Sequence, residues 1–345
     1  MAERHQMAYQ KSRQNSNIGR IKYRFVEEME KIDLKDRRIL YELDVDSRQS
    51  FRNIGRKVGL SKDVVAGRVK KLQEKGIIKR FFAYYDILHL GYNFLRFYFK
   101  FQYVTPDIKQ EIIDHFMNDE NVNNLFSTEG AYDLGVLMMV ENISDIYPLW
   151  RKTLEKYGDY FSQQVFSAYM GESIYGHRFL LEGIEKPQRT PLQKNLAKVK
   201  IDALDLEILK LLVVDSRIPT VEIAKKLNSN VTTINARINR LVKEKVILGF
   251  SVELDMNKLG YQTWKVDFYL SEYTKLHQIV QYLEKNPLLY CVDYTIGYAD
   301  LEIEINVKDN NQLHDIIEDL HSKFPKLIRN YASFLGIKFY KWYSL

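Results

Sequence analysis

The chain repeats itself at an offset of 169 residues, and this internal repeat limits its possible folds more than any other feature. The segment IDLKDRRILYELDVDSR at 32–48 recurs as IDALDLEILKLLVVDSR at 201–217, and the match runs without a gap to the tripeptide LGY at 90–92 and 259–261. A weaker match, at an offset of 167, relates GAYDLGVLMMV at 130–140 to GYADLEIEINV at 297–307. A fixed period indicates that one structural unit was duplicated. We therefore expect two copies of one unit, each with a helical head and a mixed α+β body.

Each head has the pattern of three helices followed by a β-hairpin. In the first head we expect a second helix over about 50–58, a turn at Gly59 and an N-cap for the third helix at Ser61. In the second head Asn228 takes the place of the turn glycine and Asn230 that of the capping serine, so the turn chemistry survives. The segments after the third helices, GIIKRFFAYYD and KVILGFSVELD, are typical of short β wings.

Each body has the pattern β-α-β-β-α-β, beginning at FLRFYFKFQYV in the first copy and at TWKVDFYL in the second. The expected fold class is α+β, with two winged helix-turn-helix domains alternating with two ferredoxin-like βαββαβ domains. The polar N-terminal arm is expected to be flexible, with contact to DNA as the alternative. The expected boundaries are an N-terminal arm (1–31), a first head (32–88), a first body (89–182), a polar linker (183–200), a second head (201–257) and a second body (258–345).

The third helix of each head has an outward face that packing does not explain. On a helical wheel the apolar residues of GLSKDVVAGRVKKL (59–72) fall in one sector, so Gly67 faces outward beside Lys70 and Lys71. An interior glycine weakens a helix by roughly 1 kcal/mol relative to alanine, but it lets a large body approach the helix backbone. The two lysines make the major groove of DNA a fitting partner. The second copy has the small Ala236 at the matching position. The alternative is a solvated surface with no partner.

Charge is divided unequally between head and body. Residues 32–85 hold 14 Lys/Arg against 7 Asp/Glu, whereas residues 101–182 hold 5 against 13. A basic head on an acidic body is the electrostatic pattern of a nucleic-acid-binding protein. We expect Lys70, Lys71 and Arg240 to lie near phosphates, and Arg68 and Arg237 to brace the helix or touch the DNA backbone. The candidate DNA contacts are Ser61, Lys62, Asp63, Gly67, Arg68, Lys70, Lys71, Asn230, Thr232, Asn235, Arg237, Asn239 and Arg240.

Head, wing, LGY junction and body together resemble the Lrp/AsnC (feast/famine) transcription regulators. The head pattern IDxxDxxIL…DSR…GLS…R…L…GII carries the resemblance, which covers about 32–182 and 201–345. It implies a sequence-specific regulator of transcription that binds double-stranded DNA, in the cytoplasm and associated with the nucleoid. It also implies bodies that pair face to face, often form higher homo-oligomers, and in many members bind an amino acid or a related small molecule. Family members usually have one copy per chain, so here we expect the two bodies to pair within the chain as a pseudo-dimer.

The resemblance also implies a ligand site at a G-x-x-D turn between the central strands of each body. The turns in this sequence are Gly130–Asp133 and Gly297–Asp300. Turn amides could hold a carboxylate while the aspartate accepts from an ammonium group. Equally, the glycine could serve the turn itself and the aspartate its backbone donors. The candidate effector contacts are Gly130, Asp133, Gly297 and Asp300.

The open sheet faces of the two bodies have opposite charges. Arg96 and Lys100 alternate with apolar residues in the first strand of the first body, and Glu302 and Glu304 do so in the third strand of the second. Pairing of the unlike bodies would bring these charges together and favour that pairing. The alternative is that all four side chains reach solvent and never meet. An exposed pair would contribute only about 0–1 kcal/mol.

Motifs for other chemistry are absent from the sequence. The chain has one cysteine, Cys291, seven scattered histidines, and no P-loop, dinucleotide-binding glycine motif or nucleophile elbow. We therefore expect no cofactor, no metal and no enzymatic activity. No apolar run suggests a signal peptide or a membrane span, so no membrane partner is expected.

Two alternative functions stay open. One is a siroheme-decarboxylase-like enzyme of the same fold, which the resemblance associates with a His/Arg-rich segment in the central strands. The corresponding segments here, 123–140 and 290–307, contain neither histidine nor arginine. The other is a nonspecific, chromatin-like organiser of DNA.

Overall fold

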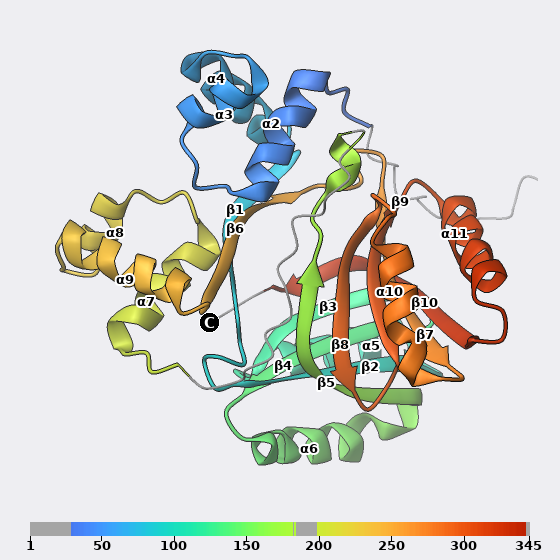
Figure 1. The fold of residues 1–345 in the computed structure, drawn as a ribbon. Coiled ribbons are helices and arrows are strands. Elements are labelled where there is room, and N and C mark those ends of the chain that lie inside the picture. Colours follow the sequence, from blue (N-terminus) through green and yellow to red (C-terminus); the bar gives the residue numbers. More distant parts are fainter. Residues whose placement is uncertain (1–28, 182, 184–198, 343–345) are drawn as a thin grey trace, which may run out of the picture.

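The structure is a computed structural model that describes residues 29–181, 183 and 199–342. Figure 1 shows two helical heads beside a body built mostly of strands. Most of the expected N-terminal arm (1–31) and linker (183–200) lies outside the described residues. Among the helices that are described, none is long and apolar enough to cross a membrane.

Both heads contain the three expected helices, and their turn chemistry is confirmed. Gly59 and Asn228 are left-handed, with φ of 68° and 48°. The side chain of Ser61 accepts a hydrogen bond from the Val64 amide at the start of the third helix, and the matching Asn230 also caps its helix. The helices are α2 (Leu34–Val45), α3 (Phe51–Val58) and α4 (Lys62–Glu74) in the first head, and α7 (Ala203–Val214), α8 (Thr220–Lys226) and α9 (Val231–Lys243) in the second.

The wing differs from the expected pattern, because neither head forms a hairpin of its own. Each head supplies one strand, β1 (Ile78–Tyr85) from the first and β6 (Ile247–Leu254) from the second, and the two pair antiparallel. Phe81 lies opposite Val252 in this ribbon. A single strand leaves its backbone groups unpaired, and the duplicated head provides the partner. The wing therefore joins the two heads.

Both bodies have the expected order β-α-β-β-α-β. The two middle strands of each body follow one another through a short turn, and each helix crosses from one strand to another. The elements are β2 (Asn93–Phe101), α5 (Pro106–Met117), β3 (Val122–Gly130), β4 (Leu134–Val140), α6 (Tyr147–Tyr157) and β5 (Phe161–Ile174), then β7 (Gln262–Leu270), α10 (Leu276–Leu283), β8 (Leu289–Ile296), β9 (Leu301–Val307), α11 (Asn310–Lys323) and β10 (Ile328–Lys341).

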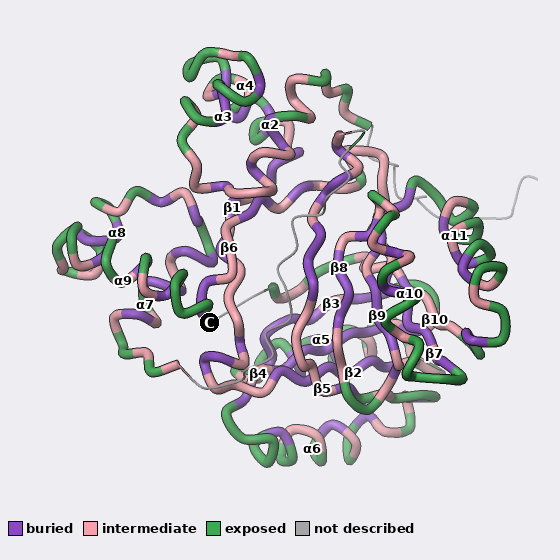
Figure 2. Tube along the Cα trace, viewed as in Figure 1, coloured by how far each residue is buried: buried purple, intermediate pink, exposed green. Residues whose placement is uncertain are grey.

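The two four-stranded sheets close into one barrel with the order β10-β3-β4-β2-β5-β8-β9-β7. The joints between the bodies are β5 with β8 and β10 with β3, so the expected pairing of the bodies within one chain is observed. The helices pack on the outside, where Leu95, Phe97 and Phe99 meet α5 and α6. In Figure 2 buried positions run along the barrel strands, and exposed positions follow the outer sides of α6, α10 and α11. Closure covers the second face of each sheet and leaves no barrel edge unpaired.

A buried ion network lies on the inner face of the barrel, at the seam between the bodies. Arg96 of the first body donates to Asp293 Oδ2 at 2.7 Å and to Glu302 Oε2 at 2.6 Å in the second body. Lys265 Nζ lies 2.8 Å and 2.7 Å from the same two oxygens. All four side chains are at most 7% exposed. The expectation that these charges could stay apart in solvent is therefore wrong for Arg96 and Glu302.

The other two charges do not join this network. Lys100 Nζ turns to the Gly130 carbonyl at 3.0 Å and to Asp133 Oδ1 at 3.2 Å, both within its own body. Glu304 lies near Glu172 in the wall of a cavity, as described below. The alternation of charges along the strands predicted the face correctly, but it could not tell which charge would lie opposite which.

The ion network is not symmetric between the copies. Arg96 and Lys265 occupy equivalent positions of the repeat, so each body contributes one cation. The acids come from the second body alone, because the positions equivalent to Asp293 and Glu302 are Phe126 and Gly135. Only a first body paired with a second body thus gives both cations their carboxylates.

Asp267 is a further buried carboxyl beside this network. Its side chain is fully buried, neither of its oxygens has a hydrogen-bond partner, and Lys265 Nζ is 3.9 Å away. Burial raises the pKa of Asp267 to about 8, since the neighbouring Lys265 only partly offsets the loss of solvation and Glu302 adds repulsion. The opposite holds for Asp293: burial favours its neutral form, but Lys265 and Arg96 outweigh this and hold its pKa near 2.

Removing one member of the network should destabilise the whole barrel. Arg96→Met leaves two buried carboxylates to share one lysine, and we expect a loss of about 3–5 kcal/mol in the free energy of unfolding. Glu302→Gln added to that variant should recover part of the loss. The control is Arg151→Met, which breaks an exposed pair with Glu155 and should change stability by about 0–1 kcal/mol. Denaturant unfolding measures all three, and equal effects of Arg96→Met and Arg151→Met would contradict the account.

The raised pKa of Asp267 predicts a pH dependence of stability. A carboxyl with a folded-state pKa near 8 and an unfolded-state value near 3.9 adds stability that is complete below about pH 4 and is lost as the pH rises through 8. The substitution Asp267→Asn keeps the shape of the side chain and removes the ionisable carboxyl group. We therefore expect the variant to match the wild type near pH 4 and to melt at a higher temperature at pH 9, by roughly 2–4 °C for each kcal/mol. If the difference in Tm between variant and wild type stayed the same across this pH range, the raised pKa of Asp267 would be contradicted.

Candidate nucleic-acid interface

Helix α4 presents an outer face free of packing. Val65, Val69 and Leu72 are at most 2% exposed and form its core side, as the helical wheel predicts. Gly67 lies on the opposite side, and a Cβ added to it would meet no atom within 4 Å. Another molecule could approach the helix backbone closely at this point.

The charged residues of α4 are available on the same helix. Lys62, Asp63, Lys70 and Lys71 are exposed. Lys70 has one partner, Glu74, at 3.7 Å across an exposed helical turn, and such contacts contribute little to stability. Ser61 uses its hydroxyl for the N-cap. The two lysines can therefore turn towards phosphates without breaking a stabilising interaction.

Helix α9 has a similar shape but a different surface. Thr232, Asn235, Ala236 and Asn239 are exposed, opposite a core side made of Ile234, Ile238 and Leu241. Its outer face thus offers hydroxyl and amide groups, which donate to and accept from base edges in the major groove. The small residue expected near its centre is in place.

Three arginines of these helices are engaged within the protein. Arg68 Nη1 lies 2.7 Å from both Asp33 and Asp36 at the start of α2. Arg237 contacts the equivalent Asp202 and Asp205 at the start of α7. Arg68 and Arg237, which were expected to brace the helix or to touch the DNA backbone, thus each connect the third helix of their head to the first.

Arg240 was expected near phosphates, but its guanidinium bonds to the buried carboxylate of Asp205. The equivalent position in the first head is Lys71, which is exposed. Helices α4 and α9 therefore differ in free charge as well as in sequence.

The two heads are joined by a motif whose role the sequence pattern did not reveal. Ser47 and Ser216 are equivalent residues of the repeat, and their buried hydroxyl oxygens lie 2.7 Å apart. Arg48 donates to the Ser216 carbonyl at 2.5 Å, and Arg217 donates to the Ser47 carbonyl. The tripeptide DSR could have pointed to this contact between the heads, because it is identical in both copies while most of the residues around it differ.

The heads also contact the barrel. His177 donates its backbone amide to Asp44 in α2 at 2.7 Å, and the hydroxyls of Tyr84 in the wing and Tyr290 in β8 lie 2.9 Å apart. A cavity of about 100 Å³ lies between wing and barrel, with Tyr84 on one side and Glu172 and Glu304 on the other.

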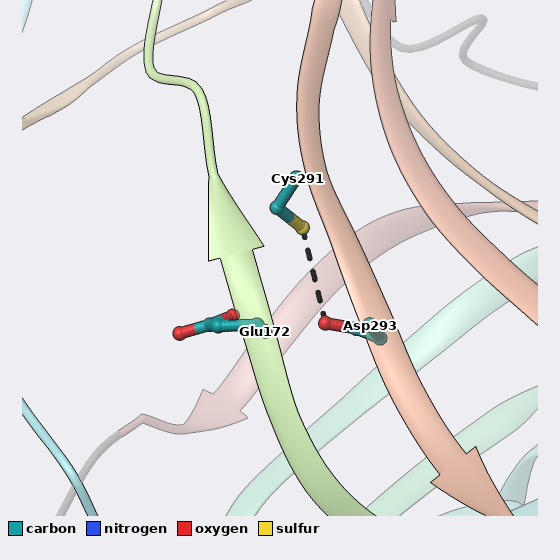
Figure 3. Close-up of side chains that lie close together, drawn as sticks. All are labelled: Glu172, Cys291 and Asp293. Atoms are coloured by element: carbon teal, nitrogen blue, oxygen red, sulfur yellow. Dashed lines mark hydrogen bonds between the residues drawn. The ribbon is translucent and has the colours of Figure 1, made fainter. Parts of the chain in front are cut away.

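Three possible metal ligands meet at the edge of this cavity. Ligand atoms of Glu172, Cys291 and Asp293 lie within 4.8 Å of one another, and Figure 3 shows them on neighbouring strands. Burial raises the pKa of the Cys291 thiol and brings that of Glu172 to about 8, so both are protonated at neutral pH. Asp293 is already paired with Arg96 and Lys265. Glu172 and Cys291 are therefore neutral side chains that pack against the ionised, already paired carboxylate of Asp293.

The candidate effector turns have a structural role in both bodies. Gly130 and Gly297 have φ of 120° and 109°, which favours glycine, and a Cβ on Gly130 would lie 2.5 Å from the Ser333 carbonyl oxygen. Asp133 accepts from the Phe101 amide at 2.8 Å, and Asp300 accepts from the Leu270 amide at 2.6 Å. Both aspartates thus fasten the turn to a neighbouring strand.

Comparisons with known proteins agree with the architecture of the heads. The AsnC-type helix-turn-helix domain matches residues 32–73, and a winged helix-turn-helix DNA-binding domain matches residues 201–247. An uncharacterised HTH-type transcriptional regulator of Pyrococcus horikoshii is 33% identical over 138 residues, which are 40% of this chain and 87% of the relative. An HTH-type transcriptional regulator of Methanocaldococcus jannaschii is 34% identical over 129 residues, covering 35% of this chain and 84% of the relative.

The paired arrangement also has a counterpart among solved structures. The crystal structure of the siroheme decarboxylase NirDL matches with a TM-score of 0.60 and covers 90% of this chain and 93% of that chain. At 13% identity this match shows a shared fold and carries no statement about activity. The relatives that match in sequence do so over most of their own length. This chain accordingly belongs to the Lrp/AsnC family of HTH-type transcriptional regulators, with the helix-turn-helix head present twice.

Proposed function

We propose that the chain is a sequence-specific regulator of transcription that inserts α4 and α9 into the major groove of double-stranded DNA. The observation that carries this proposal is the outer face of the two helices. A small residue, Gly67 or Ala236, lies at its centre, and exposed polar or basic side chains surround it. This combination admits a groove and offers contacts to both phosphates and bases.

The two helices are suited to different contacts. Lys70 and Lys71 on α4 can neutralise phosphates, which supplies affinity without sequence information. Asn235 and Asn239 on α9 carry amides, which can bond in pairs to the N6 and N7 atoms of adenine. The presence of base-reading groups favours a specific regulator over a nonspecific organiser of DNA.

An enzymatic role of the siroheme-decarboxylase type has the shared fold in its favour. The central segments 123–140 and 290–307 contain no histidine or arginine. Arg96, which points into the barrel, is bound to two carboxylates. These features favour the regulator, and an added iron-porphyrin that stays with the chain through gel filtration and shows a shifted absorbance band would favour the enzyme.

Reversing the charge of α4 should weaken binding to DNA. Lys70→Glu with Lys71→Glu removes two phosphate contacts, so the slope of log affinity against log salt should fall by about two and the affinity by tenfold or more. Both residues are exposed, so the fold should persist. The matched control is Lys308→Glu with Lys323→Glu, an equal charge change on exposed residues of the second body, where α11 lies far from the heads (Figure 1).

Fluorescence anisotropy over a salt series with a duplex of selected sequence measures both variants. Unchanged affinity and slope in the α4 variant, or equal losses in the two variants, would contradict insertion of α4.

The second part of the proposal is an effector, with an amino acid as the leading class. Its support is the pair of equivalent turns, which place Asp133 beside Lys100 and Asp300 within 3.9 Å of Arg329. A ligand at either turn would meet a carboxylate and a cation, the two groups that complement an ammonium and a carboxylate.

A thermal-shift screen of the amino acids tests this part. We expect at least one to raise the Tm of the wild type, and Asp133→Ala with Asp300→Ala to abolish that rise. A screen without any hit, or a hit that survives both substitutions, would overturn the effector proposal and leave DNA binding untouched.

A further inference from the structure

We infer that the DNA target of this chain is asymmetric, with two unlike half-sites that a single chain reads in a fixed order. This inference rests on the proposed function and names the kind of DNA that it requires. It is carried by three features of the molecule: the unlike pairing of the bodies, the hydrogen-bonded joint between the heads, and the difference between helices α4 and α9.

The ion network selects the unlike pairing. Two first bodies brought together would bury two copies of Arg96 against Phe126 and Gly135, without any carboxylate from the positions that Asp293 and Glu302 fill in the second body. A buried cation without a partner is strongly destabilising. Two second bodies would instead bury two sets of the acids. Only the pairing of one body with the other matches the charges, and the barrel has that pairing.

The joint between the heads holds one first head beside one second head, so the proposed DNA-binding side is also asymmetric. The wing strands β1 and β6 pair over their length, and the Ser47–Ser216 contact with its two flanking arginines fastens α2 to α7 across the same seam. Because each head forms half of this joint, α4 and α9 are always presented together. A homodimeric regulator would present two identical helices, and its target would mirror that symmetry.

The outer faces of α4 and α9 do not repeat. The positions that hold Asp63, Ala66 and Lys70 in the first helix hold Thr232, Asn235 and Asn239 in the second. Arg240, the counterpart of Lys71, is bound to Asp205 and withdrawn from the face. The half-site under α9 should therefore carry most of the base specificity, and the half-site under α4 most of the salt-dependent affinity.

Selection of binding sites from a random duplex library by the full chain tests the inference. We expect one motif with strong base preference in one half and weak preference in the other, their centres about 10 bp or a multiple of it apart. A perfect palindrome would overturn the inference and leave the proposed function standing. No enrichment of any sequence would instead contradict the proposed function itself.

A symmetrised variant sharpens the test. The changes Asp63→Thr, Ala66→Asn, Gly67→Ala, Lys70→Asn and Lys71→Arg give α4 the outer residues of α9 at exposed or half-buried positions. Its selected motif should become a palindrome of the strongly preferred half.

Substitution within α9 should affect one half-site only. Asn235→Ala with Asn239→Ala should remove base preference from the strong half and lower affinity for the selected site about tenfold or more, while the salt slope stays as it is. A symmetrised variant that selects the wild-type motif, or an α9 variant with base preference lost equally in both halves, would overturn the assignment of half-sites.

Discussion

Two cations and two carboxylates buried inside the barrel determine how this molecule is assembled. Arg96 and Lys265 come from equivalent positions of the two copies, yet both rely on Asp293 and Glu302 of the second copy. Removing such ions from water is unfavourable unless each finds its partner. The main effect of the network is therefore to determine which bodies can pair, and its net contribution to stability is secondary. The closed barrel has the pairing that the network selects, and the shared wing and the paired heads add contacts between the same two copies.

Much of this architecture could be predicted from the sequence, because it depends on local patterns. The repeat predicted two copies, helical spacing predicted the core side of α4, and Gly59 and Asn228 predicted the turns before the third helices. The outward position of Gly67 followed from the wheel alone. These features depend on residues close together in the chain, so the pattern contains what is needed to find them.

The features that sequence reasoning missed depend on contacts between segments that lie far apart in the chain. A strand after the third helix looks like half of a hairpin, and nothing in GIIKRFFAYYD reveals that its partner strand begins at Ile247 in the second head. Lys100 and Glu304 lie on the predicted face, yet Lys100 forms an ion pair with Asp133 of its own body. The partner of Arg240 is an aspartate at the start of another helix. Periodicity assigns a residue to a face, but only the assembled fold decides which side chain meets it.

The account rests on pairing of the two copies within one chain, and a designed disulfide tests this most directly. The hydroxyl oxygens of Ser47 and Ser216 are 2.7 Å apart, so cysteine thiols at these positions would face each other, and the one native cysteine, Cys291, is buried. Ser47→Cys with Ser216→Cys, oxidised at low protein concentration, should form a disulfide within the chain and keep the mass of a single chain under denaturing, non-reducing conditions. Disulfide-linked dimers under these conditions, or free thiols at both positions, would contradict the account.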